Sequence, residues 1–185
     1  NFQFKNLQIF FLIILSILLF SISIHQTQYF HWSAALDQDI VVMYNSLLIS
    51  SGIEQEYRDH PAYTTFFIHG LVIKIFSFFN LGPISHINDL INSNNPDEEL
   101  QKLFLFCRNI NIAINISLVL LLYKSIISLK CSEISALLGT SILVVSGWFT
   151  ESLFYLRSEN LSIIFFLFSL ICLVNFFQNT NLKIV

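Results

Sequence analysis

Runs of apolar residues about as long as a membrane-spanning helix constrain this 185-residue chain more than any other feature. A helix needs about 20 mostly apolar residues to cross a hydrocarbon core of roughly 30 Å. Stretches near that length occupy residues 7–24, 103–123, 134–149 and 161–177. With 55% hydrophobic and 11% charged residues, the composition differs from that of a soluble domain. The sequence therefore predicts an all-α polytopic membrane protein with about four transmembrane helices, forming a single truncated module over residues 1–185.

Composition also limits the partners that the chain can have. A formal net charge of −3 without a basic patch argues against nucleic acid as a partner. Cys107, Cys131 and Cys172 have no CxxC spacing, so we expect small buried hydrophobes, not disulfides or metal ligands. Residues 21–28, SISIHQTQ, contain no small-x-small cleavage site. The first apolar run is therefore expected to be a retained helix and not a removed signal.

A long polar segment, residues 25–102, separates the first two apolar runs and is expected to hold the catalytic residues. Within it, residues 40–51 carry an apolar helical stripe but are too short to span a membrane. The stripe leaves three polar side chains on other faces: Asn45, Ser46 and Ser50. Residues 62–79 contain His69 and Lys74, each costly at mid-bilayer. Both stretches are predicted to be amphipathic surface helices.

The lysines predict the orientation of the chain. If residues 62–79 do not cross the membrane, four lysines fall on the side that the positive-inside rule makes cytoplasmic: Lys5, Lys124, Lys130 and Lys183. The loop 25–102 and the polar corner 150–160 then share the extracytoplasmic face. If residues 62–79 do cross, that segregation is lost, so the first arrangement is favoured. Polar groups that converge at a membrane surface are a natural candidate site.

Asp37-Gln38-Asp39 places two carboxylates just outside the first apolar run. One interpretation is structural, because acids stabilise the N-terminus of a helix. Another is catalytic: a carboxylate with its pKa raised by partial desolvation can act as a general base. The spacing of two also allows both carboxylates to approach one divalent cation, the one cofactor that the sequence suggests. Asp37 and Asp39 are the predicted catalytic residues.

Two further clusters supply the predicted substrate-binding residues: Arg58, Asp59 and His60 in the loop, and Arg157, Glu159 and Asn160 in the corner. Arginine can grip a phosphate in bidentate fashion, and histidine can donate to one or carry a proton. Structural interpretations remain open for both clusters. The first is also typical of a solvated turn before a proline-started helix, and the second of a capped helix start with an arginine snorkelling to headgroups.

The order of these motifs resembles the N-terminal module of the GT-C superfamily, and most nearly its protein O-mannosyltransferase and aminoarabinose-transferase-like group. In that group, an acidic motif follows the first span, then a glycine and an HPP or KPP motif, then two arginine positions. The matching residues are Asp37-Gln38-Asp39, Gly52, Asp59-His60-Pro61-Ala62, Arg108 and Arg157-Ser-Glu159-Asn160. Gln38 and Ala62 depart from the pattern, which has an acid and a second proline there.

The resemblance implies an inverting glycosyltransferase that moves a sugar from a polyprenyl-phosphate donor to an extracytoplasmic lipid, glycan or protein. One aspartate, Asp37 by its match, would activate the acceptor, and arginine and histidine residues would hold the donor phosphate. The expected location is the bacterial inner membrane, with membrane lipid as a partner. A transporter or flippase fragment is the main alternative and predicts breaks within spanning helices, for which Gly139 and Gly147 are the candidates. A structural protein whose loop binds a partner is a third possibility.

Overall fold

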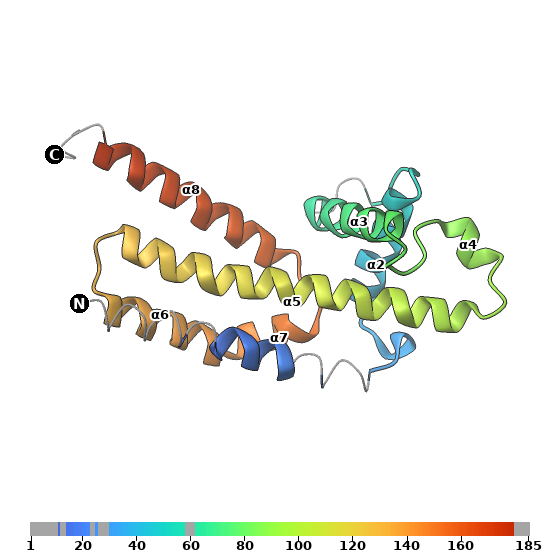
Figure 1. Cartoon of the computed structure of the whole chain (residues 1–185), viewed down its shortest axis with the longest axis horizontal. Helices are drawn as coiled ribbons and strands as arrows, with labels where there is room; N and C mark the ends of the chain where they lie inside the picture. The colour runs from blue at the N-terminus through green and yellow to red at the C-terminus, as the bar shows by residue number, and fades with distance from the viewer. Residues whose placement is uncertain (1–10, 12–13, 23–24, 26–29, 58–61, 180–185) are drawn as a thin grey trace.

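The computed structural model describes residues 11, 14–22, 25, 30–57 and 62–179. Every regular element in these residues is helical, which confirms the all-α prediction for this part of the chain. Residues 14–22 are helical. The labelled elements, shown in Figure 1, are η1 (Trp32–Ala34), α2 (Asp37–Ser50), α3 (Tyr63–Phe78), α4 (Ile87–Ile91), α5 (Pro96–Ser128), α6 (Glu133–Val145), α7 (Gly147–Phe154) and α8 (Glu159–Asn179).

Helix α5 is the axis on which the other elements pack (Figure 1). Its 33 residues make it about 50 Å long at 1.5 Å per residue, well beyond the hydrocarbon thickness. Helices α6 and α8 lie along its C-terminal part, whereas α2, α3 and α4 surround its N-terminal part. The expectation that residues 96–101 belong to a loop was wrong. Pro96 begins the helix, and Asp97, Glu98 and Glu99 in the first turn complement its dipole.

Two helices, α5 and α8, are long and apolar enough to cross a membrane. The predicted span 134–149 is divided at Ser146 into α6 and α7, which together pass the same test but are bent by 61°. Ser146 has extended backbone and its hydroxyl oxygen accepts the Phe149 N–H, so it starts a new helix. Residues 7–10, 12–13 and 23–24 of the first predicted span, 7–24, lie outside the described residues. The protein therefore has two candidate spans, or three with the bent pair, in its described part.

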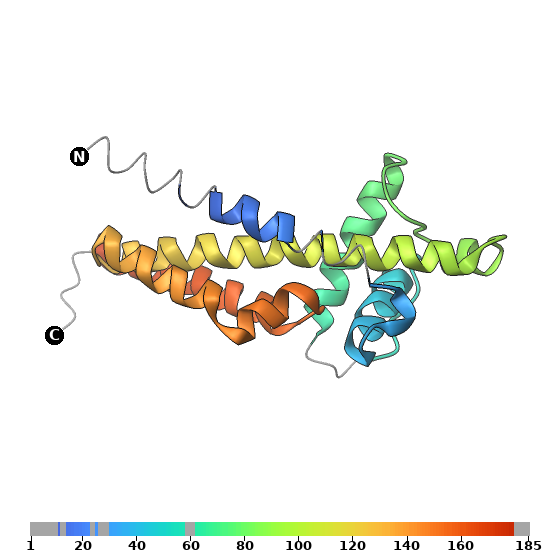
Figure 2. The same ribbon diagram turned by 90° about the horizontal axis from the view of Figure 1, so that it is seen from below.

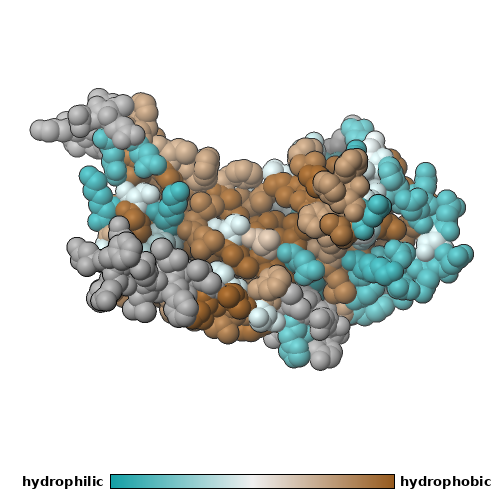
Figure 3. Space-filling model, in the orientation of Figure 1, coloured by the Kyte–Doolittle hydropathy of each residue, from teal (hydrophilic) through white to brown (hydrophobic). Residues whose placement is uncertain are grey.

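The surface has an apolar band between two polar ends (Figure 3). Exposed apolar side chains on α6 and α8 form much of it: Ile134, Leu138, Ile142, Val145, Phe165, Phe166, Phe168, Leu173 and Phe176. One polar end holds the acidic start of α5, and the other holds Lys124 and Lys130 around the α5–α6 turn. This distribution is compatible with an integral membrane protein whose long axis lies across the bilayer.

Helix α3 runs across α5 and not along it (Figure 2). Its exposed face is largely apolar, with Phe67, Leu71 and Ile75, while its buried face includes His69 and Gly70. The buried face also holds Phe66 and Ile73, and Lys74 is exposed. The exposed apolar side chains suit contact with lipid.

Helix α2 buries the polar residues that were expected on other faces. Each hydroxyl or amide bonds a carbonyl one turn earlier: Asn45 to Val41, Ser46 to Val42, and Ser50 to Leu47. Satisfied in this way, small polar side chains can pack against α3, where Gly70 lies directly over the Ser46 carbonyl.

Candidate functional site

A cavity of about 260 Å³ lies between α2 and the corner that joins α7 to α8. Its polar lining comes from both sides: Asp37 and Gln38 from α2, Tyr57 from the following loop, and Ser158 and Glu159 from the corner. Its apolar lining is Val41, Val42, Ala62 and Leu156. Residues more than 100 positions apart in the sequence thus share one concave, partly polar surface.

Asp37 and Asp39 have opposite environments because they lie two positions apart on a helix, about 200° around its axis. Asp37 is exposed and lines the cavity. Asp39 is fully buried and points at α5, where its Oδ2 lies 3.2 Å from Nη2 of Arg108. Its Oδ1 accepts the Leu156 N–H at 2.6 Å. The two carboxylates do not converge on one cation.

The surroundings of Asp39 fit a structural anchor. Burial raises the pKa of its carboxyl above the ordinary value, and the Leu156 N–H and the Arg108 guanidinium act in the opposite direction. Arg108 also lies over the rings of Phe30 and Phe104, with its guanidinium carbon 4.8 and 4.4 Å from their centroids. Both oxygens of Asp39 are therefore engaged, and none of its surface is open to a substrate.

The corner reaches α2 through Arg157. Its Nη1 donates to Oε1 of Gln38 at 3.2 Å, and its Nη2 lies 4.0 Å from a carboxylate oxygen of Glu151. Glu159 begins α8 and lines the cavity. Asn160 does not reach it: this residue is fully buried, with its Nδ2 donating to Oδ1 of Asn115 at 3.1 Å.

Three predicted site residues, Arg58, Asp59 and His60, lie outside the residues that the structure describes. The residues before and after that gap, Tyr57 and Ala62, both line the cavity. Among the described residues, no group of three or more His, Cys, Asp or Glu side chains is arranged to hold a metal ion.

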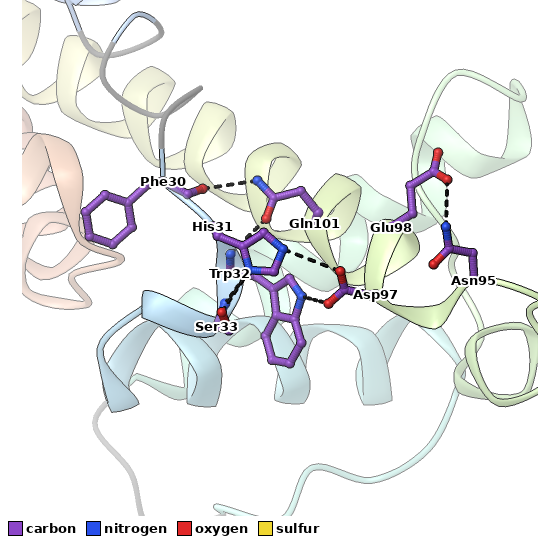
Figure 4. A network of polar contacts seen from close by, with 8 residues as sticks. All are labelled: Phe30, His31, Trp32, Ser33, Asn95, Asp97, Glu98 and Gln101. Atoms are coloured by element: carbon purple, nitrogen blue, oxygen red, sulfur yellow. Dashed lines mark hydrogen bonds and ion pairs between the residues drawn. The ribbon is translucent and has the colours of Figure 1, made fainter.

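The segment before α2 is fastened to the start of α5 (Figure 4). Trp32 donates its backbone N–H to Oε1 of Gln101 at 2.8 Å and its indole N–H to Oδ1 of Asp97 at 2.7 Å. Nε2 of His31 lies 3.4 Å from Oδ2 of the same aspartate, and Gln101 returns a bond to the Phe30 carbonyl. These contacts fix where α2 begins, and with it the place of Asp37.

His69 is a buried titratable group away from the cavity. Burial lowers the pKa of its ring to about 4, although the carbonyls of Thr65 and Cys107 favour the protonated form. Nδ1 lies 2.9 Å from the Thr65 carbonyl oxygen. The ring is therefore neutral at pH 7 and belongs to the packing between α3 and α5.

The sequence interpretation missed Asn111 and Asn115, which lie beneath the corner. With Arg108 they follow an i, i+3, i+7 pattern, so all three occupy one face of α5. All three are buried. Polar residues at helical spacing within an otherwise apolar span are unusual, and that spacing was the signal available in the sequence.

Comparison with known proteins adds no relative: no family model, no curated protein and no solved structure matches this chain.

Proposed function

We propose that this chain belongs to a membrane glycosyltransferase that moves a sugar from a polyprenyl-phosphate donor to an acceptor outside the cytoplasm. The observation that carries the proposal is the shared cavity, in which the α2 residues Asp37 and Gln38 face Ser158 and Glu159 of a distant corner. Residues of two motifs that follow the GT-C order in the sequence, the acidic motif and the corner, therefore contribute to the lining of one cavity.

Asp37 is the proposed general base. As the acceptor oxygen or nitrogen attacks the anomeric carbon, Asp37 takes its proton, and the bond between that carbon and the donor phosphate oxygen breaks with inversion. Polyprenyl phosphate leaves with the electron pair. Asp37 suits this role because it is exposed at the cavity, whereas both oxygens of Asp39 are engaged by Leu156 and Arg108.

Arg157 is the proposed phosphate contact from the corner, because it lies between two cavity-lining residues, Leu156 and Ser158. Its present partner, the neutral amide of Gln38, can be exchanged for a charged phosphate oxygen. Arg58 and His60 remain candidates for the same role from the sequence alone.

We further propose that the cavity faces the outside of a bacterial inner membrane. The polar end with Lys124 and Lys130 would be cytoplasmic by the positive-inside rule. Helix α3 runs across α5 and exposes an apolar face. It would then lie in the outer interface of the membrane and would not span the bilayer.

The test is sugar transfer in membranes that express the complete reading frame. Labelled sugar is followed from endogenous polyprenyl-phosphate donors to any acceptor, for the wild type, Asp37→Asn and the control Asp89→Asn, which changes an exposed acid on α4. Loss of transfer in Asp37→Asn alone, at equal protein level, supports the proposal. Equal transfer in all three removes Asp37 from the chemistry and contradicts the proposed mechanism.

A transporter is the second candidate, and one observation favours it. The break at Ser146 and Gly147 within the bent α6–α7 pair is the kind of discontinuity that transporters place at a substrate site. A flippase would move an intact lipid-linked sugar across the membrane without cleaving it. The appearance of intact, labelled lipid-linked sugar in the opposite leaflet would therefore distinguish a flippase from the transferase.

A further inference from the structure

The corner between α7 and α8 is held in place by amide side chains of α5. Nδ2 of Asn111 donates to the carbonyls of Ser152 and Tyr155 at 2.8 and 2.9 Å. Nδ2 of Asn115 donates to the same Ser152 carbonyl at 3.0 Å. These carbonyls lie at and just beyond the end of α7, where a helix leaves its last carbonyls without intrahelical partners.

Asn115 uses the whole bonding capacity of its amide. Its Nδ2 also donates to the Asn111 carbonyl at 2.9 Å, while its Oδ1 accepts from the Ser152 hydroxyl at 2.9 Å and from Nδ2 of Asn160 at 3.1 Å. A carboxamide offers two N–H donors and two acceptor lone pairs, so Asn115 is satisfied at every position. One side chain therefore joins α5 to both α7 and α8.

This network replaces water where water is scarce. Asn111, Asn115, Ser152 and Asn160 are each at most 1% exposed. An unbonded carbonyl in such surroundings costs free energy, and irregular backbone within an apolar bundle persists only where protein groups satisfy it. An apolar residue at position 111 would remove the donor to the Tyr155 carbonyl and one of the two donors to the Ser152 carbonyl. An apolar residue at position 115 would remove the other Ser152 donor and the acceptor of the Ser152 hydroxyl and the Asn160 amide. In either case the corner would have to move to find other partners.

We propose that Asn111 and Asn115 are positioning residues that hold the α7–α8 corner against α2. Arg157 and Glu159 follow the tethered carbonyls in the chain. Arg157 donates a hydrogen bond to Gln38, and Glu159 lines the cavity. The asparagines act through the backbone of the corner and do not touch the cavity themselves. Their contribution to catalysis rests on the proposed function, whereas the tether rests on the hydrogen bonds of Asn111 and Asn115 alone.

The test measures the position of the corner by cross-linking, without any activity assay. In the full chain with its three native cysteines replaced, Gln38→Cys and Arg157→Cys form a near pair across the cavity, where the two native side chains bond at 3.2 Å. Ser128→Cys and Gln178→Cys form a distal pair, at the place where the Gln178 amide bonds the Ser128 carbonyl at 3.0 Å. A short bifunctional thiol reagent is applied to each pair in detergent micelles.

Asn111→Leu and Asn115→Leu are each expected to lower the near-pair yield by about fivefold or more while the distal pair is unchanged. Asn109→Leu is the matched control, because it changes the same residue type on an exposed face of the same helix. It is expected to leave both yields unchanged. A structural defect spread over the whole bundle would lower both pairs together.

An unchanged near-pair yield in both leucine variants would overturn the proposal. If a leucine variant also loses the distal cross-link, a serine at the same position takes its place, and a near-pair yield equal to that of the wild type then contradicts the tether. The transferase proposal fails separately, through unaltered transfer in Asp37→Asn. The two failures are therefore distinguishable.

Discussion

Removing either partner of the buried Asp39–Arg108 ion pair should destabilise the fold far more than removing both. The pair lies at 3.2 Å, with its side chains 0% and 3% exposed. Asp39→Leu leaves a buried guanidinium whose remaining contacts, among the described residues, are aromatic rings. Arg108→Leu leaves a buried carboxylate without its cation. Each single substitution is expected to lower the free energy of unfolding by about 3–5 kcal/mol.

The double variant should lose much less, because it buries no unpaired charge. What remains is the Leu156 N–H, which loses its acceptor, at a cost of about 1–3 kcal/mol for an unsatisfied buried donor. The double variant should therefore be more stable than at least one single variant. Such strong coupling is expected only for side chains in direct contact.

Equilibrium unfolding of the four proteins in mixed micelles measures this coupling. The exposed pair Glu98–Lys102, at 2.8 Å on the first turns of α5, is the control and should show no measurable change on removal. A double variant whose loss equals the sum of the two single losses, within about 0.5 kcal/mol, would refute the reasoning. The two side chains would then act independently, and Asp39 would not anchor α2 to α5.

Three further predictions concern α3 and the topology. Because the ring of His69 has a pKa of about 4 when folded and about 6.5 when unfolded, only the unfolded state gains a proton as pH falls through that window. Stability should thus fall by about 2 kcal/mol from pH 7 to pH 5, and His69→Gln should remove this part of the slope; an unaltered slope contradicts the assignment. Gly70→Ala places a Cβ 2.8 Å from a backbone oxygen of α2 and should lower the free energy of unfolding by about 1–3 kcal/mol, measured by thermal unfolding. Gly147→Ala is the control, because a Cβ there meets open space. Equal effects of the two substitutions would contradict a close approach of α3 to α2. Asn94→Cys should react with an impermeant thiol reagent only from outside, and native Cys131, exposed at the opposite end, only from the cytoplasm; the reverse pattern would invert the topology.

The class of the fold could be predicted from the sequence because hydropathy over about 20 residues depends on no other part of the chain. Local signals also worked for α2: the expected helix 40–51, with acids at its start, is found as Asp37–Ser50. The break at Ser146 was not expected in the favoured interpretation, in which 134–149 is one span, although Gly147 was a candidate break in the transporter alternative. Serine and glycine also occur within unbroken spanning helices, so the local sequence does not distinguish a bend from close helix packing.

The site was harder to predict because its geometry depends on contacts between distant elements. Asp37 and Asp39 look equivalent in the sequence, and only the packing of α2 on α5 makes one buried and the other exposed. Likewise, the partners of Asn111 are more than 40 positions away in the chain. Hydropathy marks such a residue as unusual but does not say which backbone groups it bonds.

The face of α5 that carries Arg108, Asn111 and Asn115 explains why the parts of the site can hold a fixed geometry. Seven residues of helix separate the first from the last, about 10 Å along the axis, and that spacing is set by the hydrogen bonds of the helix itself. Arg108 holds α2 through Asp39, and the asparagines hold the corner through its carbonyls. Because Asp39 also accepts the Leu156 N–H, α2 and the corner are tied to each other as well as to α5. The cavity therefore lies between two elements whose separation is fixed by a third, and this is the rigid support that a catalytic arrangement of side chains requires.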